Sequence, residues 1–168
     1  MRIKVTLASD VGIRAVEPTS ASADHAMRAY LHDVASSYHR RPATPDELET
    51  ALLEHPSNDL IAPDGVFLVA TTSADVVCGC VALARVTPGV GEVRRLHVAR
   101  RFRRLGLGRR LMLEVEHRAR GMGFAQLRLD TRSDLVESQR LYESLGYCET
   151  PPHSGGPYSD IWYGKLLG

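Results

Sequence analysis

Hydrophobic residues along the 168-residue chain follow two different spacings, and each spacing predicts a different kind of element. In five segments they alternate with polar residues or form short apolar runs, as strands do. These segments are Val11 to Val16, Val66 to Ala70, Val76 to Leu83, Glu92 to Val98 and Ala125 to Thr131. Turn-forming stretches at 71–75 and 87–91 separate the second, third and fourth segments, which predicts three antiparallel strands in a row.

Apolar residues at three- and four-residue spacing predict two helices after the first strand. The first covers Ala26 to Val34 and stops before Arg40-Arg41-Pro42, with Ser22 or Asp24 as its N-cap. The second begins at Thr44-Pro45-Asp46-Glu47, where a threonine cap, a proline and two carboxylates favour the start of a helix.

The clearest helix of the chain runs from Leu107 to Met122, with a regular apolar ladder on one face and charged residues on the others. Gly121 and Gly123 end it. Because this helix lies between the strands 92–98 and 125–131, the pattern predicts a right-handed parallel crossover.

The end of the chain predicts one more helix and two closing strands. Asp134 and Glu137 resemble a capping box for a helix that ends at Gly146. The strands are Tyr147 to Thr150 and Ile161 to Leu167, and the proline-rich loop between them is long enough to wall a pocket. We therefore expect a mixed α/β fold, with a mostly antiparallel sheet, helices on both faces and a central parallel strand pair.

Length and composition fit this expectation. A chain of 168 residues that is 43% hydrophobic suits a single globular domain, 1–168. The three cysteines form no Cys-x-x-Cys pair, no apolar stretch reaches the roughly 20 residues of a membrane span, and no signal peptide is visible. These features predict a cytoplasmic protein that is not bound to a membrane.

The net charge is only +1, yet eight arginines crowd the stretch from Arg94 to Arg110. A local basic cluster suits a small polyanion better than a duplex, and single-strand binders interleave more aromatics than the one residue found here, Phe102. We therefore expect no nucleic-acid partner. We also expect no metal, because His25, His32 and His39 recur every seven residues, about 10 Å apart along a helix.

The stretch Arg103 to Arg110 joins a predicted strand to the clearest helix and contains Gly106 and Gly108. Two glycines allow a close approach of the backbone to a ligand, and the free amides of the helix start form an anion site. The spacing is not that of a Walker loop, which needs Gly-Lys-Ser/Thr, or of a dinucleotide fingerprint, which needs a third glycine.

The stretch does resemble the acyl-CoA signature of the GNAT superfamily of N-acyltransferases, (Gln/Arg)-x-x-Gly-x-(Gly/Ala), through Arg103, Gly106 and Gly108. A second motif, Leu141-Tyr142-Glu143-Ser144-Leu145-Gly146-Tyr147, is similar to the family's Leu-Tyr-x-x-x-Gly-(Phe/Tyr) helix ending. The predicted order of elements also matches that of the family. The resemblance implies acetyl-CoA as acyl donor and a small-molecule or protein amine as acceptor, and it leaves a homodimer open.

The resemblance also implies which residues act. The pantetheine arm would lie along Leu96-His97-Val98, the pyrophosphate on the turn, and the oxyanion near the Val98 amide. The implied cofactor-binding residues are Leu96, His97, Val98, Arg103, Arg104, Leu105, Gly106, Leu107, Gly108, Arg109, Ser138 and Tyr142. Three departures from the family pattern stand in this region: Leu135 where Asn is common, Ser138 where Ala is common, and Arg104 in place of a glycine.

Two candidate catalytic residues follow from the resemblance. Tyr142 would donate to the leaving thiolate, or else it is a core aromatic of its helix. Glu92 would act as the base, or else it pairs with Arg94 or Arg95, and His97 is the reserve candidate.

The favoured interpretation is an N-acetyltransferase that uses direct attack by an amine, and the alternative is a non-catalytic acyl-CoA sensor of the same fold. Carboxylates do not obviously converge, so we expect an acceptor with one amino group and a nearby carboxylate or apolar part. Arg94 and Arg95 could hold such a carboxylate.

Overall fold

The structure is a computed structural model and describes residues 10–168. Its elements are β1 (Val11–Val16), α1 (Ala21–His39), α2 (Pro45–Glu54), β2 (Gly65–Thr72), β3 (Val77–Thr87), β4 (Val90–Val98), the short 3₁₀ helix η1 (Arg100–Phe102), α3 (Leu107–Gly121), β5 (Gln126–Thr131), α4 (Val136–Ser144), β6 (Cys148–Thr150) and β7 (Ile161–Leu166). The predicted order of strands and helices is confirmed. The strands β2, β3 and β4 are longer than their apolar runs suggested, whereas β5, β6 and β7 are each one residue shorter than predicted.

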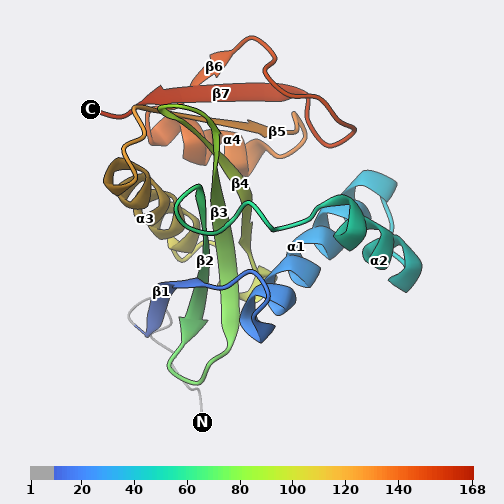
Figure 1. Cartoon of the computed structure of the whole chain (residues 1–168). Helices are drawn as coiled ribbons and strands as arrows, with labels where there is room; N and C mark the ends of the chain where they lie inside the picture. Colours follow the sequence, from blue (N-terminus) through green and yellow to red (C-terminus); the bar gives the residue numbers. More distant parts are fainter. Residues whose placement is uncertain (1–9) are drawn as a thin grey trace.

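All seven strands form one sheet in the order β1-β2-β3-β4-β5-β7-β6. Neighbouring strands are antiparallel except β4 and β5, which are parallel and are joined through α3 (Figure 1). The predicted mixed sheet with a central parallel pair is therefore confirmed.

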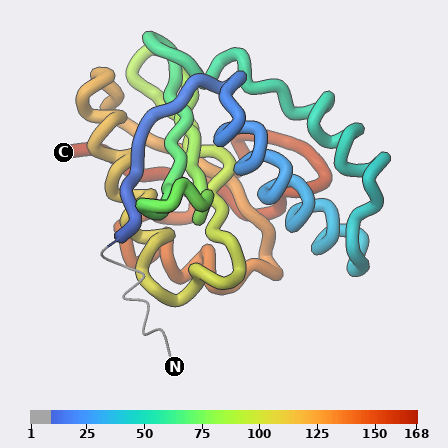
Figure 2. The backbone as a smooth tube through the Cα atoms, turned by 90° about the horizontal axis from the view of Figure 1, so that it is seen from below, coloured from blue at the N-terminus to red at the C-terminus, as the bar shows by residue number. Residues whose placement is uncertain are grey.

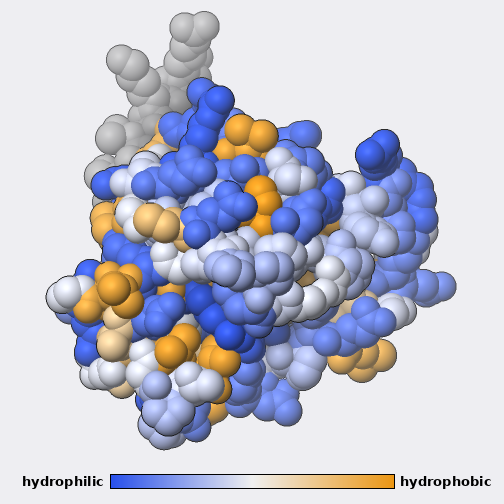
Figure 3. All heavy atoms as spheres, turned by 90° about the horizontal axis from the view of Figure 1, so that it is seen from above, coloured by the Kyte–Doolittle hydropathy of each residue, from blue (hydrophilic) through white to orange (hydrophobic). Residues whose placement is uncertain are grey.

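The helices cover the sheet from both sides. Figure 1 shows α1 and α2 on the opposite side of β2–β4 from α3, and Figure 2 shows the same separation from below. Met27 and Leu31 of α1 pack with Phe67 and Val69 on one face. On the other face, α3 and α4 contribute to a larger core with β3, β4 and β5. The surface on the β6–β7 side is mostly hydrophilic, with small separated hydrophobic areas (Figure 3).

Helix starts were predicted with mixed success. Thr44 caps α2 in a complete capping box with Glu47, as expected. The predicted cap of α1 was wrong, because Ser20 accepts from the Ala23 amide while Asp24 pairs with Arg28 one turn on.

The predicted capping box of α4 was also wrong. Asp134 is engaged by both Nε and Nη2 of Arg132, at 2.9 and 2.6 Å, and Glu137 pairs with Arg104 at 3.3 Å. The helix begins at Val136 with no side-chain cap. Arg132, two residues upstream, therefore binds the Asp134 carboxylate that the sequence spacing predicted as the helix cap.

The feature of the sheet that matters most for function is an irregularity in β4. In the ladder with β3, Cys80 pairs with His97 and Ala82 with Arg94, so Arg95 and Leu96 together oppose Val81. Arg95 has a positive φ of 60°, which completes a β-bulge. On the other side of β4, the parallel pairing with β5 stops at Glu92 opposite Arg128. Beyond that point the two strands part.

Among the described residues, no helix is long and apolar enough to cross a membrane.

A buried ion pair holds α3 against the sheet. Glu116 is 2% exposed, and Nζ of Lys165 on β7 donates to both of its carboxylate oxygens at 2.9 Å. Arg120 adds a longer contact at 3.7 Å. Because α3 begins at the glycine turn, this pair helps to fix the position of that turn.

We predict that Lys165→Met lowers the free energy of unfolding by about 3 kcal/mol, because it leaves a buried carboxylate without its main partner. Chemical denaturation would measure the loss. Arg28→Met is the control, since Arg28 forms exposed pairs with Asp24 and Glu49 and its removal should change stability little. Equal free energies of unfolding for the two variants would show that the Lys165–Glu116 pair does not stabilise the fold.

Candidate active site

A cleft of about 1480 Å³ opens where β4 and β5 part. The end of β4, the end of β5 and the turn before α3 form its base, and α1 and the start of α4 form its sides. The loop 155–159 between β6 and β7 completes the wall. Because β4 has no β5 partner beyond Glu92, its edge offers unpaired backbone groups to anything that enters the cleft.

The glycine turn forms one end of the cleft. Gly106 is the N-cap of α3 with a φ of 78°, and within the described part of the chain no side chain caps the helix. The first intrahelical amide bond is given by Arg110, to the Gly106 carbonyl, so the amides of the first helical turn stay free of intrahelical partners. A Cβ on Gly108 would lie 3.3 Å from Leu141 Cδ2 and 3.8 Å from Val98 Cγ2. The turn therefore forms a narrow concave surface, or cradle, of free N–H groups, which is the geometry expected of the predicted anion site.

The arginines of the turn have different surroundings. Arg104 adopts a φ of 62° and its side chain is 83% exposed, so it points outward as expected for a residue in place of a glycine. Arg109 donates weakly to Ser144 Oγ at 3.4 Å. Arg103 is turned inward, with Nε on the Val98 carbonyl at 2.8 Å and Nη2 on Asp33 at 2.9 Å. Leu105 is 43% exposed and does not line the cleft.

Glu92 lies at the point where β4 and β5 part, and its side chain is only 12% exposed. Arg94 Nε donates to one of its oxygens at 2.6 Å, and Arg128 Nε donates to the other at 2.8 Å. Both carboxylate oxygens are thus bound by guanidinium groups. The ion pair with Arg94 that we considered is present, and it is joined by a second pair that sequence spacing did not suggest.

Arg94 and Arg95 line the cleft, but their donors are already used. Arg94 reaches Asp59 at 2.7 Å in addition to Glu92. Arg95 is 9% exposed and donates to the carbonyls of His55 and Pro56 and to Ser57 Oγ. Burial lowers the pKa of the Arg95 guanidinium from its usual value. A substrate carboxylate would have to compete with these internal partners, so this predicted role stays a prediction.

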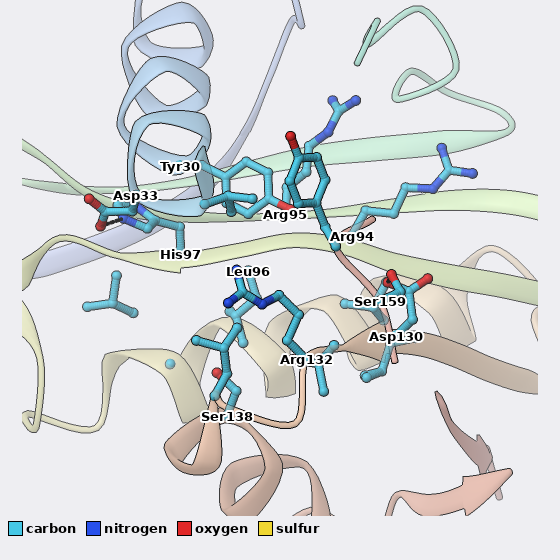
Figure 4. Close-up of a pocket in the computed structure, with 18 of the residues that line it drawn as sticks. Tyr30, Asp33, Arg94, Arg95, Leu96, His97, Asp130, Arg132, Ser138 and Ser159 are labelled. Atoms are coloured by element: carbon cyan, nitrogen blue, oxygen red, sulfur yellow. Dashed lines mark hydrogen bonds and ion pairs between the residues drawn. The ribbon is translucent and has the colours of Figure 1, made fainter. Parts of the chain in front are cut away.

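Tyr142 and Ser138 line the cleft from α4, and Figure 4 shows Ser138 across from the Leu96 side chain of β4. Tyr142 is 6% exposed and packs between Tyr147 and Tyr163. Burial raises the pKa of its phenol, so the hydroxyl remains protonated near neutral pH and can act as a donor. Tyr142 is thus a buried aromatic of α4 that also lines the cleft, and its role as a donor to the leaving thiolate stays a prediction.

The far wall of the cleft combines the β6–β7 loop, which the sequence predicted as a pocket wall, with Asp130, which the sequence did not single out. Asp130, at the end of β5, accepts from Ser154 Oγ and Ser159 Oγ, each at 2.6 Å, and so holds the β6–β7 loop over the cleft (Figure 4). Tyr158 of that loop packs edge-on against Tyr38 of α1, with ring centroids 5.1 Å apart. The end of a parallel strand is a usual place for ligand contacts, so Asp130 could have been noticed.

Asp33 of α1 is the other residue that sequence reasoning missed. Its Oδ2 lies 2.8 Å from His97 Nε2 on β4 and 2.9 Å from Arg103 Nη2 in the turn (Figure 4). The hydrogen bond from His97 is the main cause that lowers the pKa of this carboxyl, and Arg103 adds to it. Nothing on the polar face of α1 distinguishes Asp33 before the fold brings these partners together.

The cleft thus combines an anion cradle, a free strand edge and buried ionisable groups. A phosphorylated ligand could place its phosphates on the turn and extend an arm along β4. The far end of that arm would then reach the region of Tyr30, His97 and Tyr142.

Comparisons with known proteins agree with this geometry. A sequence model of the acetyltransferase (GNAT) family matches residues 26–147. An uncharacterized N-acetyltransferase of Schizosaccharomyces pombe is 33% identical over 115 residues, which cover 68% of this chain and 71% of that protein. A GNAT-family acetyltransferase from Staphylococcus aureus Mu50 has a similar structure, with a TM-score of 0.76 at 17% identity over 94% of this chain and 99% of the other. The PaiA N-acetyltransferase of Thermoplasma acidophilum, solved in complex with coenzyme A, gives a TM-score of 0.68 at 17% identity, covering 93% and 98% of the two chains.

Proposed function

Because this chain belongs to the acetyltransferase (GNAT) family, and so is an acyl-CoA-dependent acyltransferase, we propose that it moves an acetyl group from acetyl-CoA to a primary amine. The observation that carries this proposal is the free edge of β4, which leads along one cleft to the cradle of amides at the start of α3. The coenzyme A complex of the Thermoplasma protein supports the choice of donor.

The parts of the cleft suit such a donor. The pyrophosphate would accept hydrogen bonds from the turn 104–109, where free amides and the helix dipole favour negative charge. The pantetheine arm would add to the edge of β4 like a further strand. Backbone N–H groups near the bulge would then face the thioester oxygen and stabilise the oxyanion that forms on attack.

The chemistry needs no covalent enzyme intermediate. The nitrogen lone pair of the amine attacks the thioester carbonyl, an N–C bond forms, and the C–S bond breaks. Two proton movements accompany this step: the acceptor ammonium must lose a proton, and the departing sulfur needs a donor. The buried, protonated hydroxyl of Tyr142 is the donor that we assign to the sulfur.

The acceptor end of the cleft favours a compound with a single amino group. Most carboxylates there already have partners: Glu92 and Asp59 bind arginines, and Asp130 binds two serines. A polycation would need several carboxylates free to converge on it. The wall also carries the aromatic side chains of Tyr30 and Tyr158, which suit an apolar body beside the amine.

The function is tested by release of free thiol from acetyl-CoA with a panel of amino acids, aryl-alkyl amines, peptide N-termini, polyamines and aminoglycosides. We expect turnover with acceptors of one amino group. Robust turnover confined to polycations would overturn the acceptor class. Binding of acetyl-CoA without turnover of any amine would favour the sensor.

We predict that Gly108→Val abolishes the thermal stabilisation of the protein by acetyl-CoA. The first carbon of the added side chain would already lie 3.3 Å from Leu141 Cδ2, so the branched valine would press on Leu141 and fill the cradle of amides. Gly106→Val should act similarly, because its φ of 78° is one that branched residues rarely adopt. Gly121→Val is the control, since a Cβ there meets nothing within 4 Å. Wild-type affinity for acetyl-CoA in both turn variants would contradict the assignment of the turn.

We predict that Tyr142→Phe lowers turnover by about 10²–10⁴-fold while acetyl-CoA affinity changes little, because the hydroxyl would act mainly on the leaving sulfur. Single-turnover kinetics measure the chemical step directly. Tyr147→Phe is the matched control, since Tyr147 packs beside Tyr142 but does not line the cleft. An unchanged chemical step in Tyr142→Phe would leave that residue a purely structural role.

A further inference from the structure

The cleft contains a hydrogen-bonded carboxylate–imidazole pair, Asp33 and His97, whose members lie 64 residues apart in the chain. Figure 4 shows the two side chains facing each other at one side of the cleft, with Leu96 and Tyr30 beside them. His97 is 9% exposed and lines the cleft next to the bulge of β4. The Tyr30 ring packs edge-on against the imidazole, with centroids 6.3 Å apart.

The pair fixes which nitrogen of His97 is free. The pKa of Asp33 is lowered by its bonds to His97 and Arg103, so the carboxylate is ionised and can only accept hydrogen bonds. Nε2 of His97, 2.8 Å from Asp33 Oδ2, must therefore carry the hydrogen. In the neutral ring, Nδ1 then keeps a lone pair, and within residues 10–168 no hydrogen bond to Nδ1 is present. Because Nδ1 is bonded to the ring carbon nearest the main chain, it lies on the β4 side of the ring.

Glu92, the other candidate on β4, has a different environment. Both of its oxygens accept from arginine Nε groups, at 2.6 and 2.8 Å. A proton placed on this carboxylate would weaken two charge-assisted hydrogen bonds. The hydrogen bonds of the two candidates therefore differ: among the residues that the structure describes, one ring nitrogen of His97 has no hydrogen-bond partner, whereas both oxygens of Glu92 are engaged.

We propose that His97 is the residue that takes the proton from the acceptor ammonium, and that Asp33 is a positioning residue that holds its ring and tautomer. This proposal rests on the proposed acetyl transfer. His97 Nδ1 removes one proton from the ammonium and passes it to solvent. The freed lone pair forms the N–C bond, the C–S bond breaks, and the second proton lost by the nitrogen ends on the departing sulfur.

Several charged or titratable groups surround the His97 ring and contribute to the electrostatic environment of the Asp33–His97 pair. Asp33 and Tyr30 face it from α1, Arg103 shares Asp33 Oδ2 with it from the turn, and Cys80 is its register partner on β3. His32 lies on the other side of Asp33, with Nδ1 3.8 Å from Oδ1. Arg103 touches the same carboxylate oxygen, so it links the pair to the turn that would hold the cofactor.

The test compares His97→Gln with His32→Gln in the thiol-release assay, using the best amine of the panel. We expect His97→Gln to lower kcat/KM for the amine by about 10²–10⁴-fold, as removal of a general base does. The acetyl-CoA dissociation constant and the melting temperature should stay at wild-type values. His32→Gln, which removes a half-exposed histidine beside the same Asp33, should keep the wild-type rate.

Two further measurements separate proton transfer from a structural role. In the smaller variant His97→Ala, added imidazole should restore part of the lost rate, because a free base can occupy the space of the missing ring. Asp33→Asn keeps an oxygen that can accept from Nε2 but removes the charge. It should lower kcat by about tenfold and leave KM for acetyl-CoA unchanged.

The outcomes are distinguishable from failure of the proposed function. If the wild-type protein releases no thiol with any amine, the acetyl transfer itself is overturned, and the role of His97 with it. If the wild type is active and His97→Gln keeps its rate, only the role of His97 is overturned. If His97→Gln lowers the rate and the acetyl-CoA affinity by the same factor, and imidazole does not rescue His97→Ala, then His97 has a structural role only.

Discussion

The parting of β4 from β5 is the constraint on which the rest of the site depends. Two parallel strands with matched ladders would remain paired to their ends and leave no cleft. Here the bulge at Arg95 and Leu96 adds a residue to β4 and turns it away from β5 after Glu92. The bulge has a positive φ at an arginine, which is unfavourable for a side chain with a Cβ. Three hydrogen bonds from the buried Arg95 guanidinium to residues 55–57 offset this and hold the distortion in place.

The charges of the cleft are arranged unevenly around that opening. At the turn, backbone amides and the start of α3 provide positive potential that no side chain of the helix cap neutralises. At the opposite end, the two cations Arg94 and Arg128 are balanced by the two carboxylates Glu92 and Asp59 through short hydrogen bonds. A ligand with phosphates at one end and an uncharged acyl group at the other would therefore bind in one direction only. The distribution of charge, and not the net charge of +1, provides this polarity.

Periodicity and turn residues were enough to predict the order of the elements, because a strand or an amphipathic helix is specified by residues close in sequence. The glycine turn could be placed for the same reason, since Gly106 and Gly108 act through their own backbone. Features that depend on distant partners could not be predicted. The cap of α4 failed because Arg132 takes Asp134.

The same limit applies inside the site. The environment of Glu92 depends on Arg128, which is 36 residues away, and that of Asp33 on His97, which is 64 residues away. The ion pair of Glu92 with Arg94 could be predicted from sequence spacing, because the two residues are neighbours on the same strand. The sequence does not distinguish Asp33 from the other polar residues of α1, because only the packing of α1 over β4 brings its carboxylate to the His97 imidazole.

The two ends of the cleft are also built by different kinds of contact, and this difference bears on how the acceptor is chosen. The end that would hold the donor consists of backbone: a strand edge, a turn and a helix start. The acceptor wall is held by side chains, through the bonds of Asp130 to Ser154 and Ser159 and the contact of Tyr158 with Tyr38. Replacing those side chains would reshape the wall without disturbing the ladders of the sheet. Under the proposed acetyl transfer, a chain built in this way can keep one donor and change its acceptor, so the identity of the amine would be sought in α1 and the β6–β7 loop and not in the motifs that identify the family.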